Sequence, residues 1–261
     1  MSTMNAIFNA QPRVKSYRDI QLGSVQKPIE YPKEYKSDIS WLKPLYQNGY
    51  PMCGAHAGAH LKMGLDYYDN KNIISYSPVS LWKLIKRDGT DPNEGTGMDR
   101  IFSCLKKFGI CDWSLLPTDY TKDLYYLSKN DLTQEQLDNA QPKIIRAYAY
   151  GKNDVDSIKR DVFVNKFMLI LLDVGNTWWG QEIVYKPTKI YGGHFVTAYG
   201  YDENYIYIID SADNGIPLKR LPFYVTKIRE TGTAIDIPNE EVEKLTKQIK
   251  SLRDLINKYK K

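Results

Sequence analysis

Cysteine and long apolar runs are both scarce in this sequence. Only three cysteines occur in 261 residues, and an odd count leaves at least one thiol free, which argues against a disulfide framework. The longest apolar run, residues 167–172, has the length of a strand, whereas a membrane-spanning helix needs about 18 apolar residues. Residues 1–13 lack the apolar core of a secretory signal. We therefore expect a cytoplasmic protein with no membrane partner, or a virion-associated one if a phage encodes it.

The excess of positive over negative side chains is also small. The formal net charge is +5 at pH 7, and part of this excess comes from the lysines of residues 244–261. The sequence has no basic stripe with interleaved aromatic residues and no nucleic-acid-binding motif, so nucleic acid is not an expected partner. With 42% hydrophobic and 26% charged residues, the composition is that of a globular chain with one large domain or two small ones.

Helical patterns dominate the first half of the chain and extended patterns the second half. Helices are predicted over residues 53–70, from Pro78 onward, over 98–108 and, in a polar stretch, over 122–140. Strands are predicted over residues 143–150, 168–172, 194–200 and 205–209, and a helix over 154–164 takes Asn153 as its cap. This division predicts an α+β fold with two lobes.

Composition divides the chain into a polar N-terminal arm (residues 1–27), a main domain (28–236) and a C-terminal helix (237–261). In the last segment, apolar residues alternate at spacings of three and four: Val242, Leu245, Ile249, Leu252, Ile256 and Tyr259. This heptad seam is typical of a two-stranded parallel coiled coil and would make a homo-oligomer through residues 240–261. Because the seam is short, a terminal helix packed on its own domain is an equal alternative.

One of the three cysteines has a setting suited to chemistry. A cysteine reacts as its thiolate, and Cys53 opens the helix predicted over residues 53–70, where free backbone N–H groups and the helix dipole favour negative charge. Cys104 lies in mid-helix among apolar residues, and Cys111 follows that helix in an apolar loop. We predict that Cys53 is a nucleophile and that the other two are core residues.

Two of the three histidines lie close to this cysteine in sequence. His56 and His60 follow Cys53 on the same helix in the pattern C-x2-H-x3-H. A zinc site needs further ligands, and no second pair of cysteines or histidines supplies them. We therefore expect no metal and two structural histidines, with a zinc site as a minor alternative.

The third histidine is the better candidate base. His194 follows two glycines at the start of a predicted strand, and Asp210 directly follows the next strand. If the two strands form a hairpin, the Asp210 carboxylate can orient the His194 imidazole. Nucleophile, base and orienting acid would then form the arrangement that activates a thiol for attack on an acyl carbon.

These residues and their order resemble the active-site motifs of the papain family of cysteine peptidases. In that family a glutamine six residues before the cysteine lends its amide to the oxyanion hole, and Gln47 has this position relative to Cys53. Residues 192–201 resemble the family's histidine strand, and residues 208–211 resemble its Asn-Ser segment. Residues 76–78, 94–97 and 105–110 are similar to its Ser-Pro helix, its glycine loop at the cleft and its next helix. The likeness extends from about residue 28 to 225.

The resemblance implies a papain-like two-lobe fold, with a helical N-terminal lobe, an antiparallel β-rich C-terminal lobe and a catalytic domain over residues 28–236. It implies a hydrolase of peptide bonds that acts through a thioester and needs no cofactor, with a peptide or protein as its substrate. The implied catalytic residues are Cys53, His194, Asp210 and Gln47. The implied substrate-binding residues are Gly95, Thr96, Gly97 and Gly193. A catalytically inactive binding or assembly module, and a hydrolase of peptidoglycan cross-peptides or isopeptides, are the alternatives.

The sequence departs from the family pattern at four positions. Gly54 stands where the family has tryptophan after the nucleophile, and Tyr50 stands where it has a disulfide-forming cysteine. Asp210 replaces the family's asparagine, and Ala212 replaces a tryptophan that covers the histidine pair. We predict that Asp210 still accepts the imidazole N–H and that the pair is less shielded from water. The short arm of residues 1–27 argues against control by an inhibitory prodomain.

Overall fold

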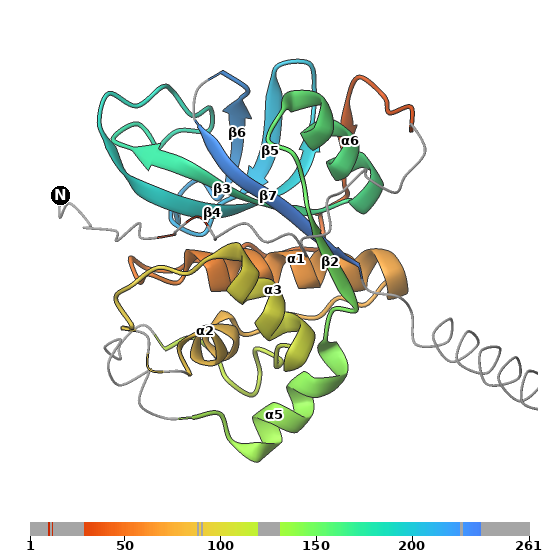
Figure 1. Cartoon of the computed structure of the whole chain (residues 1–261), viewed down its shortest axis with the longest axis vertical. Helices are drawn as coiled ribbons and strands as arrows, with labels where there is room; N and C mark the ends of the chain where they lie inside the picture. The colour runs from red at the N-terminus through yellow and green to blue at the C-terminus, as the bar shows by residue number, and fades with distance from the viewer. Residues whose placement is uncertain are drawn as a thin grey trace, which may run out of the picture.

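Two lobes, one helical and one built on an antiparallel sheet, meet along the first long helix (Figure 1). The computed structural model describes residues 10, 12, 29–87, 89, 91–119, 131–224 and 227–235, and every structural statement below refers to these residues. The predicted α+β fold, with helices in the first lobe and antiparallel strands in the second, is confirmed. Most of the arm predicted over residues 1–27 and the heptad helix predicted over 237–261 lie outside the described residues.

The first lobe contains α1 (Cys53–Asn70), α2 (Pro78–Lys86), α3 (Met98–Lys107) and α5 (Gln134–Ala140), the last followed by a 3-10 turn over Gln141–Lys143. Local capping sets where two of these helices begin. Ser77 accepts a hydrogen bond from the N–H of Ser80 ahead of α2, and Thr133 and Gln136 form a reciprocal capping box at α5. Of the helix predicted over residues 122–140, the structure describes only the part from residue 131, and its helical turns begin at Gln134.

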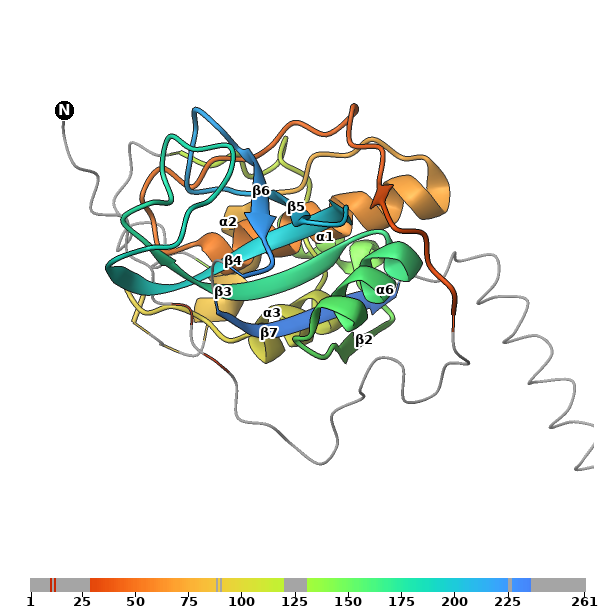
Figure 2. The same ribbon diagram turned by 90° about the horizontal axis from the view of Figure 1, so that it is seen from above.

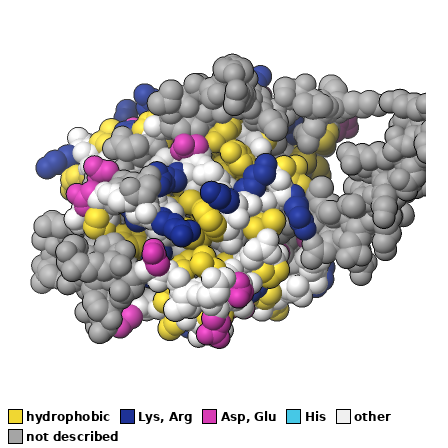
Figure 3. All heavy atoms as spheres, turned by 60° about the horizontal axis from the view of Figure 1, so that its bottom comes forward, with side chains coloured by type: hydrophobic (Ala, Val, Ile, Leu, Met, Phe, Trp, Pro, Cys, Tyr) yellow, Lys and Arg dark blue, Asp and Glu magenta, His cyan; other side chains and the backbone are white. Residues whose placement is uncertain are grey.

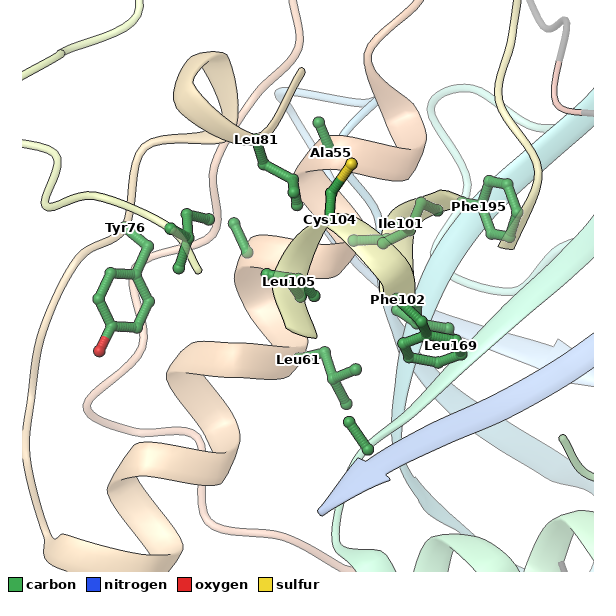
Figure 4. Packing of buried hydrophobic residues seen from close by; sticks show 14 of the residues in the cluster. Ala55, Leu61, Tyr76, Leu81, Ile101, Phe102, Cys104, Leu105, Leu169 and Phe195 are labelled. Carbon is green, nitrogen blue, oxygen red and sulfur yellow. The ribbon is translucent and has the colours of Figure 1, made fainter. Parts of the chain in front are cut away.

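Helix α1 is buried along most of its length because small residues let its neighbours come close. A Cβ atom added to Gly58 would stand 2.8 Å from Leu81 of α2 and 2.9 Å from Ile101 of α3. Figure 4 shows Leu81 and Ile101 packed with Leu105 against α1. The helix predicted over residues 53–70 is confirmed with these bounds, and it lies in the core.

The second lobe is a sheet in which all named strands pair antiparallel. Its strands are β2 (Ala147–Tyr150), β3 (Met168–Gly175), β4 (Ile190–Tyr201), β5 (Tyr205–Ile209), β6 (Leu218–Pro222) and β7 (Ile228–Ile235), in the order β2-β7-β3-β4-β5-β6, with β1 (Tyr35–Lys36) paired to β4. Helix α6 (Val155–Asn165) covers one face of the sheet and α1 lies against the other (Figures 1 and 2). Because both faces are covered, every residue of β3 is buried.

Strands β4 and β5 form the expected hairpin, and its turn is built by one side chain. The Asp202 carboxylate accepts hydrogen bonds from the N–H groups of Asn204 and Tyr205 at 2.7 and 2.8 Å. The register pairs Thr197 with Ile209, so the residue after β5 lies beside the middle of β4. This pairing brings Asp210, at the end of β5, close to His194, within β4.

Some elements differ from the sequence expectation. Helix α6 begins one residue later than predicted because Asp154, and not Asn153, caps it: the Asp154 carboxylate accepts the N–H of Ser157 at 2.9 Å. The Asn153 amide instead donates to the Arg229 carbonyl at 2.7 Å. Strand β4 begins at Ile190, ahead of the predicted start, and the short or polar strands β1, β6 and β7 were not predicted.

The outer face of the helical lobe carries lysine and arginine side chains among apolar ones (Figure 3). A groove between α2 and α3 has Arg87, Arg100 and Lys107 among its lining residues. The histidines do not contribute to this surface, because all three histidines of the chain are 0% exposed.

None of the helices in the described part of the chain combines the length and apolar character needed to cross a bilayer.

Substitution of Gly64 tests how closely the two lobes pack. A Cβ atom at Gly64 of α1 would overlap the buried ring of Phe167, which leads into β3. We expect Gly64→Val to lower the free energy of unfolding by about 2 kcal/mol or more, because the ring has no space to move away. The measurement is urea denaturation followed by circular dichroism.

The matched control is Gly215→Val, at an exposed glycine where an added Cβ would meet only Asp213 Oδ1, at 3.6 Å. It should change the free energy of unfolding by less than about 0.5 kcal/mol. Equal stability of the two variants would contradict close packing at Gly64.

Candidate active site

Cys53 is the first residue of α1 and is 4% exposed. The first turn of α1 contains no acidic side chain, and no side chain caps it, so the free backbone N–H groups and the helix dipole favour negative charge there. Cys104 and Cys111 are buried in the helical lobe, and burial raises the pKa of the Cys111 thiol. Of the three thiols, only that of Cys53 lies at a helix N-terminus.

His194 and Asp210 form a fully buried pair. His194 lies on β4 and Asp210 directly follows β5, and both are 0% exposed. Imidazole Nε2 and carboxylate Oδ1 are 2.7 Å apart. Because the carboxylate can only accept, Nε2 carries the hydrogen, and Nδ1 is the ring nitrogen left to face Cys53.

The surroundings of His194 favour its protonated form. Burial alone lowers the pKa of an imidazole, but here hydrogen bonds to Asp210 and Cys53, and the negative charges of both, outweigh burial. Together they raise the pKa of His194 to about 9. The arrangement therefore holds an imidazolium at neutral pH, between a carboxylate and the sulfur of Cys53.

Gln47 is fixed by contacts that cross between the lobes. Its Oε1 accepts a hydrogen bond from the Ser211 hydroxyl at 2.7 Å, and its backbone N–H donates to the Ser211 carbonyl at 2.8 Å. Its Nε2 donates one hydrogen to the Tyr50 carbonyl at 2.7 Å. An amide nitrogen has two hydrogens, so these contacts fix the side chain and leave the second N–H for another acceptor.

The two histidines next to Cys53 bind backbone atoms. His56 Nδ1 lies 3.0 Å from the Met52 carbonyl, and His60 Nε2 accepts the N–H of Leu45 at 3.0 Å. Burial lowers the pKa of His56 to about 4 and that of His60 to about 3, so both are neutral. They tie the segment that carries Gln47 onto α1, as expected of structural histidines. Among the described residues no group of three His, Cys, Asp or Glu side chains converges as a metal site requires.

The glycine loop lies against the start of α1. A Cβ atom at Gly54 would stand 2.6 Å from Cγ2 of Thr96, and Gly97 immediately precedes α3. This contact explains why glycine follows the cysteine here: a larger side chain would push Gly95, Thr96 and Gly97 away from α1. The loop predicted to bind substrate is therefore placed next to Cys53.

One buried lysine organises the rest of that loop. Lys86 Nζ, at the end of α2, donates to the carbonyls of Asp91, Glu94 and Gly95 at 2.9, 2.7 and 3.4 Å. Lys86 is 7% exposed, so its charge is compensated by these carbonyl dipoles. No sequence pattern indicates this role of Lys86, because the carbonyls come from residues of no special type.

Gly193 is in contact with the chain's own N-terminal segment. Its carbonyl accepts the backbone N–H of Ala10 at 3.2 Å, and the Ala10 backbone fills the space that a side chain at position 193 would need. Ala10 is 1% exposed. The backbone beside His194 therefore binds another backbone edge, which is the contact that a peptide would make.

The prediction that the histidine pair is less shielded from water is wrong. Trp178, from the segment between β3 and β4, covers it: its ring lies edge-on to His194, with centroids 5.5 Å apart and planes at 81°. Its Nε1 donates to Asp210 Oδ2 at 2.7 Å. Sequence reasoning missed this residue because it precedes the histidine, whereas the family's tryptophan follows the orienting residue.

The structure thus brings Cys53, His194, Asp210 and Gln47 to one boundary between the lobes. Ser211, which holds the Gln47 amide, was missed as well. The tandem tryptophans at 178 and 179, directly after a buried strand, are the one sequence signal that could have indicated a cover.

Solved structures share this fold. Xylellain, a cysteine protease from Xylella fastidiosa, superposes with a TM-score of 0.77 at 17% identity, over 89% of this chain and 97% of that one. Procathepsin B S9 from Trypanosoma congolense gives 0.68 at 12% identity, over 88% and 87%. Bromelain from Ananas comosus, in complex with the E64 inhibitor, gives 0.60 at 14% identity, over 79% and 100%.

No protein-family model matches the sequence, and no curated protein is similar to it at a significant level. The structural matches nevertheless cover most of the chain on both sides of the comparison. The chain therefore has the papain-like two-lobe fold, as the sequence motifs implied.

The raised pKa of His194 predicts a pH-dependent stability. A folded-state pKa of about 9, above the ordinary value of about 6.5, means that the proton favours the folded state. This stabilisation is complete below about pH 6.5 and is lost as the pH rises through about 9. Urea denaturation from pH 6 to 10 should show the difference in unfolding free energy between the wild type and His194→Gln shrinking over this window. A difference that stays constant would contradict the imidazolium.

Proposed function

We propose that this protein is a cysteine peptidase that cleaves peptide bonds through a thioester on Cys53. The observation that carries the proposal is the alignment of Cys53, the His194 imidazolium and the buried Asp210 carboxylate at the boundary between the lobes. Such a pair of thiolate and imidazolium is the activated form of a cysteine nucleophile.

In the acylation step, the Cys53 thiolate attacks the carbonyl carbon of the substrate peptide bond. The oxyanion that forms would take hydrogen bonds from the second Nε2 hydrogen of Gln47 and from the Cys53 N–H, which has no partner within the first helical turn. His194 then gives its proton to the leaving amine, the C–N bond breaks, and a thioester remains.

In the deacylation step, neutral His194 takes a proton from water, and the resulting hydroxide attacks the thioester. The acid product leaves and the thiolate–imidazolium pair is restored. Asp210 keeps the imidazole in the orientation that presents Nδ1 to the sulfur.

Two contacts support a peptide as the substrate. The Gly193 carbonyl already binds a backbone N–H, that of Ala10, and the glycine loop of residues 95–97 lies against Gly54, the residue after Cys53. Main-chain groups of this kind recognise an extended peptide largely independently of its side chains. The geometry also opposes the zinc alternative, because the imidazoles of His56 and His60 are bound to backbone atoms.

Covalent labelling of Cys53 tests the nucleophile. Iodoacetamide or E-64 should label Cys53 rapidly, and mass spectrometry should find Cys104 and Cys111 unlabelled on the same time scale, because Cys53 is the thiol that His194 activates. In His194→Ala the labelling of Cys53 should slow by about 10²-fold or more, because the thiolate loses its partner. Slow, equal labelling of all three cysteines would overturn the proposal and favour a binding or assembly module.

Hydrolysis of a peptide library tests the reaction itself. Wild-type protein should release amines from peptides, and Cys53→Ala should not. Isopeptide and peptidoglycan cross-peptide substrates belong in the same panel. Turnover of these alone, with linear peptides intact, would replace the general peptidase by that narrower hydrolase.

Substitution of Lys86 tests the substrate loop. Lys86→Met removes the donor from the carbonyls of Asp91, Glu94 and Gly95, so the loop beside Cys53 should loosen. We expect KM to rise by about tenfold, with a smaller change in kcat, because binding and not chemistry is affected. Lys106→Met, at an exposed lysine of α3, is the control and should leave both constants unchanged. A fall in kcat alone would contradict a role in substrate binding.

A further inference from the structure

We propose that Trp178 is a positioning residue for the base, and that its indole N–H is the reason why an aspartate and not an asparagine stands at position 210. The buried indole N–H of Trp178 lies against Oδ2 of Asp210, and Oδ1 of the same carboxylate orients His194. The inference deepens the proposed function and rests on it for its rate measurements.

The contacts of the Asp210 side chain are all with donors. Oδ1 accepts from His194 Nε2 at 2.7 Å and from the Ala212 N–H at 2.9 Å. Oδ2 accepts from Trp178 Nε1 at 2.7 Å. Both side-chain oxygens are therefore used as acceptors, by three N–H groups that converge on one buried carboxylate.

An asparagine cannot satisfy this set. Its side chain has one acceptor oxygen and one NH₂ group that only donates. With the oxygen toward His194, the NH₂ group would face the indole N–H of Trp178, donor against donor. With the amide reversed, the NH₂ group would face His194 and Ala212, and Nε2 of the imidazole would have to accept. That tautomer carries its hydrogen on Nδ1, so the nitrogen that faces Cys53 could no longer accept the proton of the thiol.

The main chain of Trp178 is held by the same segment that carries Asp210. Lys219 Nζ, 1% exposed, donates to the carbonyls of Trp178 and Gln181 at 3.0 and 2.8 Å and to Asp213 Oδ2 at 2.8 Å. The same Asp213 oxygen accepts the N–H of Gly180 at 2.8 Å. The main chain of residues 178–181 is thus held against residues 213 and 219, which fixes the backbone position from which the buried indole reaches Asp210.

Trp178 therefore has two effects on the base. Its N–H fixes the rotation of the Asp210 carboxyl group, and so the direction in which Oδ1 meets the imidazole. Its ring, 1% exposed, closes the pair off from water, which strengthens the hydrogen bond within it. Ala212 stands where the family has its covering tryptophan, and Trp178, from the segment between β3 and β4, covers the pair instead.

A double-mutant cycle over Trp178 and Asp210 tests the inference. The proteins are the wild type, Trp178→Phe, Asp210→Asn and the double variant, and the readouts are kcat/KM and the pH profile of Cys53 alkylation by iodoacetamide. We expect Trp178→Phe to lower the alkylation rate by about tenfold and Asp210→Asn by about 10²-fold or more. The double variant should react about tenfold faster than Asp210→Asn, because without the indole N–H the asparagine can turn its oxygen to His194.

Rescue of Asp210→Asn by the loss of Trp178 is the result that a merely structural tryptophan would not give. If the two substitutions multiply, or if the double variant is slower than both, the proposed complementarity is wrong. The control is Trp82→Phe: Trp82 is buried, and no described residue accepts a hydrogen bond from its indole nitrogen, so its loss should change alkylation by less than about twofold. Thermal unfolding of each variant separates loss of fold from loss of position.

The alkylation readout also separates this inference from the proposed function. It needs no substrate, so coupling between Trp178 and Asp210 in a protein that hydrolyses no peptide would support the inference and reject the peptidase. Peptide hydrolysis without coupling would reject the inference and leave the peptidase.

Discussion

The hydrogen bond between His194 and Asp210 is the interaction on which the rest of the site depends. It joins two side chains with no exposed surface, and burial of either alone would be unfavourable, because burial lowers the pKa of an imidazole and an unpaired carboxylate is costly to bury. The pair resolves this by sharing one charged hydrogen bond, and Cys53 supplies a second negative partner. Strand pairing between β4 and β5 makes the distance possible, since its register sets the end of β5 beside the middle of β4.

The site lies where the lobes meet, and polar contacts hold its parts across that boundary. Gln47 comes with the helical lobe, yet its backbone and its side chain both bind Ser211, the neighbour of Asp210. One buried lysine in each lobe donates hydrogen bonds to a loop of the site. Lys86 donates to carbonyls of the glycine loop, and Lys219 donates to carbonyls of the segment that carries Trp178. Carbonyl dipoles satisfy the charge of Lys86, and two carbonyls together with the Asp213 carboxylate satisfy that of Lys219. Loops without regular structure are thereby fixed as walls of the site.

The sequence predicted the features that depend on neighbouring residues and missed those that depend on contacts between distant ones. The bounds of α1 and β5 were predicted correctly because a run of small and apolar residues, and a turn at Asp202, are local patterns. Cys53, Gln47, His194 and Asp210, which the structure brings together, were proposed as one site because their order and spacing are themselves a motif. Trp178 could not be, since its partner is 32 positions away and no spacing rule links them. The cap of α6 fell on Asp154 because the choice between two adjacent polar residues depends on the Arg229 carbonyl, a distant group that binds Asn153.

The protonation state of His194 decides whether the site holds an ion pair at neutral pH, and nitrogen-15 NMR of histidine-labelled protein measures that state without a substrate. The chain has only three histidines, and burial keeps two of them neutral, with pKa values of about 4 for His56 and about 3 for His60. At pH 7 one imidazole should therefore have both nitrogens protonated and titrate near pH 9, and its signals should be missing in His194→Gln. Three neutral imidazoles at pH 7 would contradict an ion pair between Cys53, His194 and Asp210.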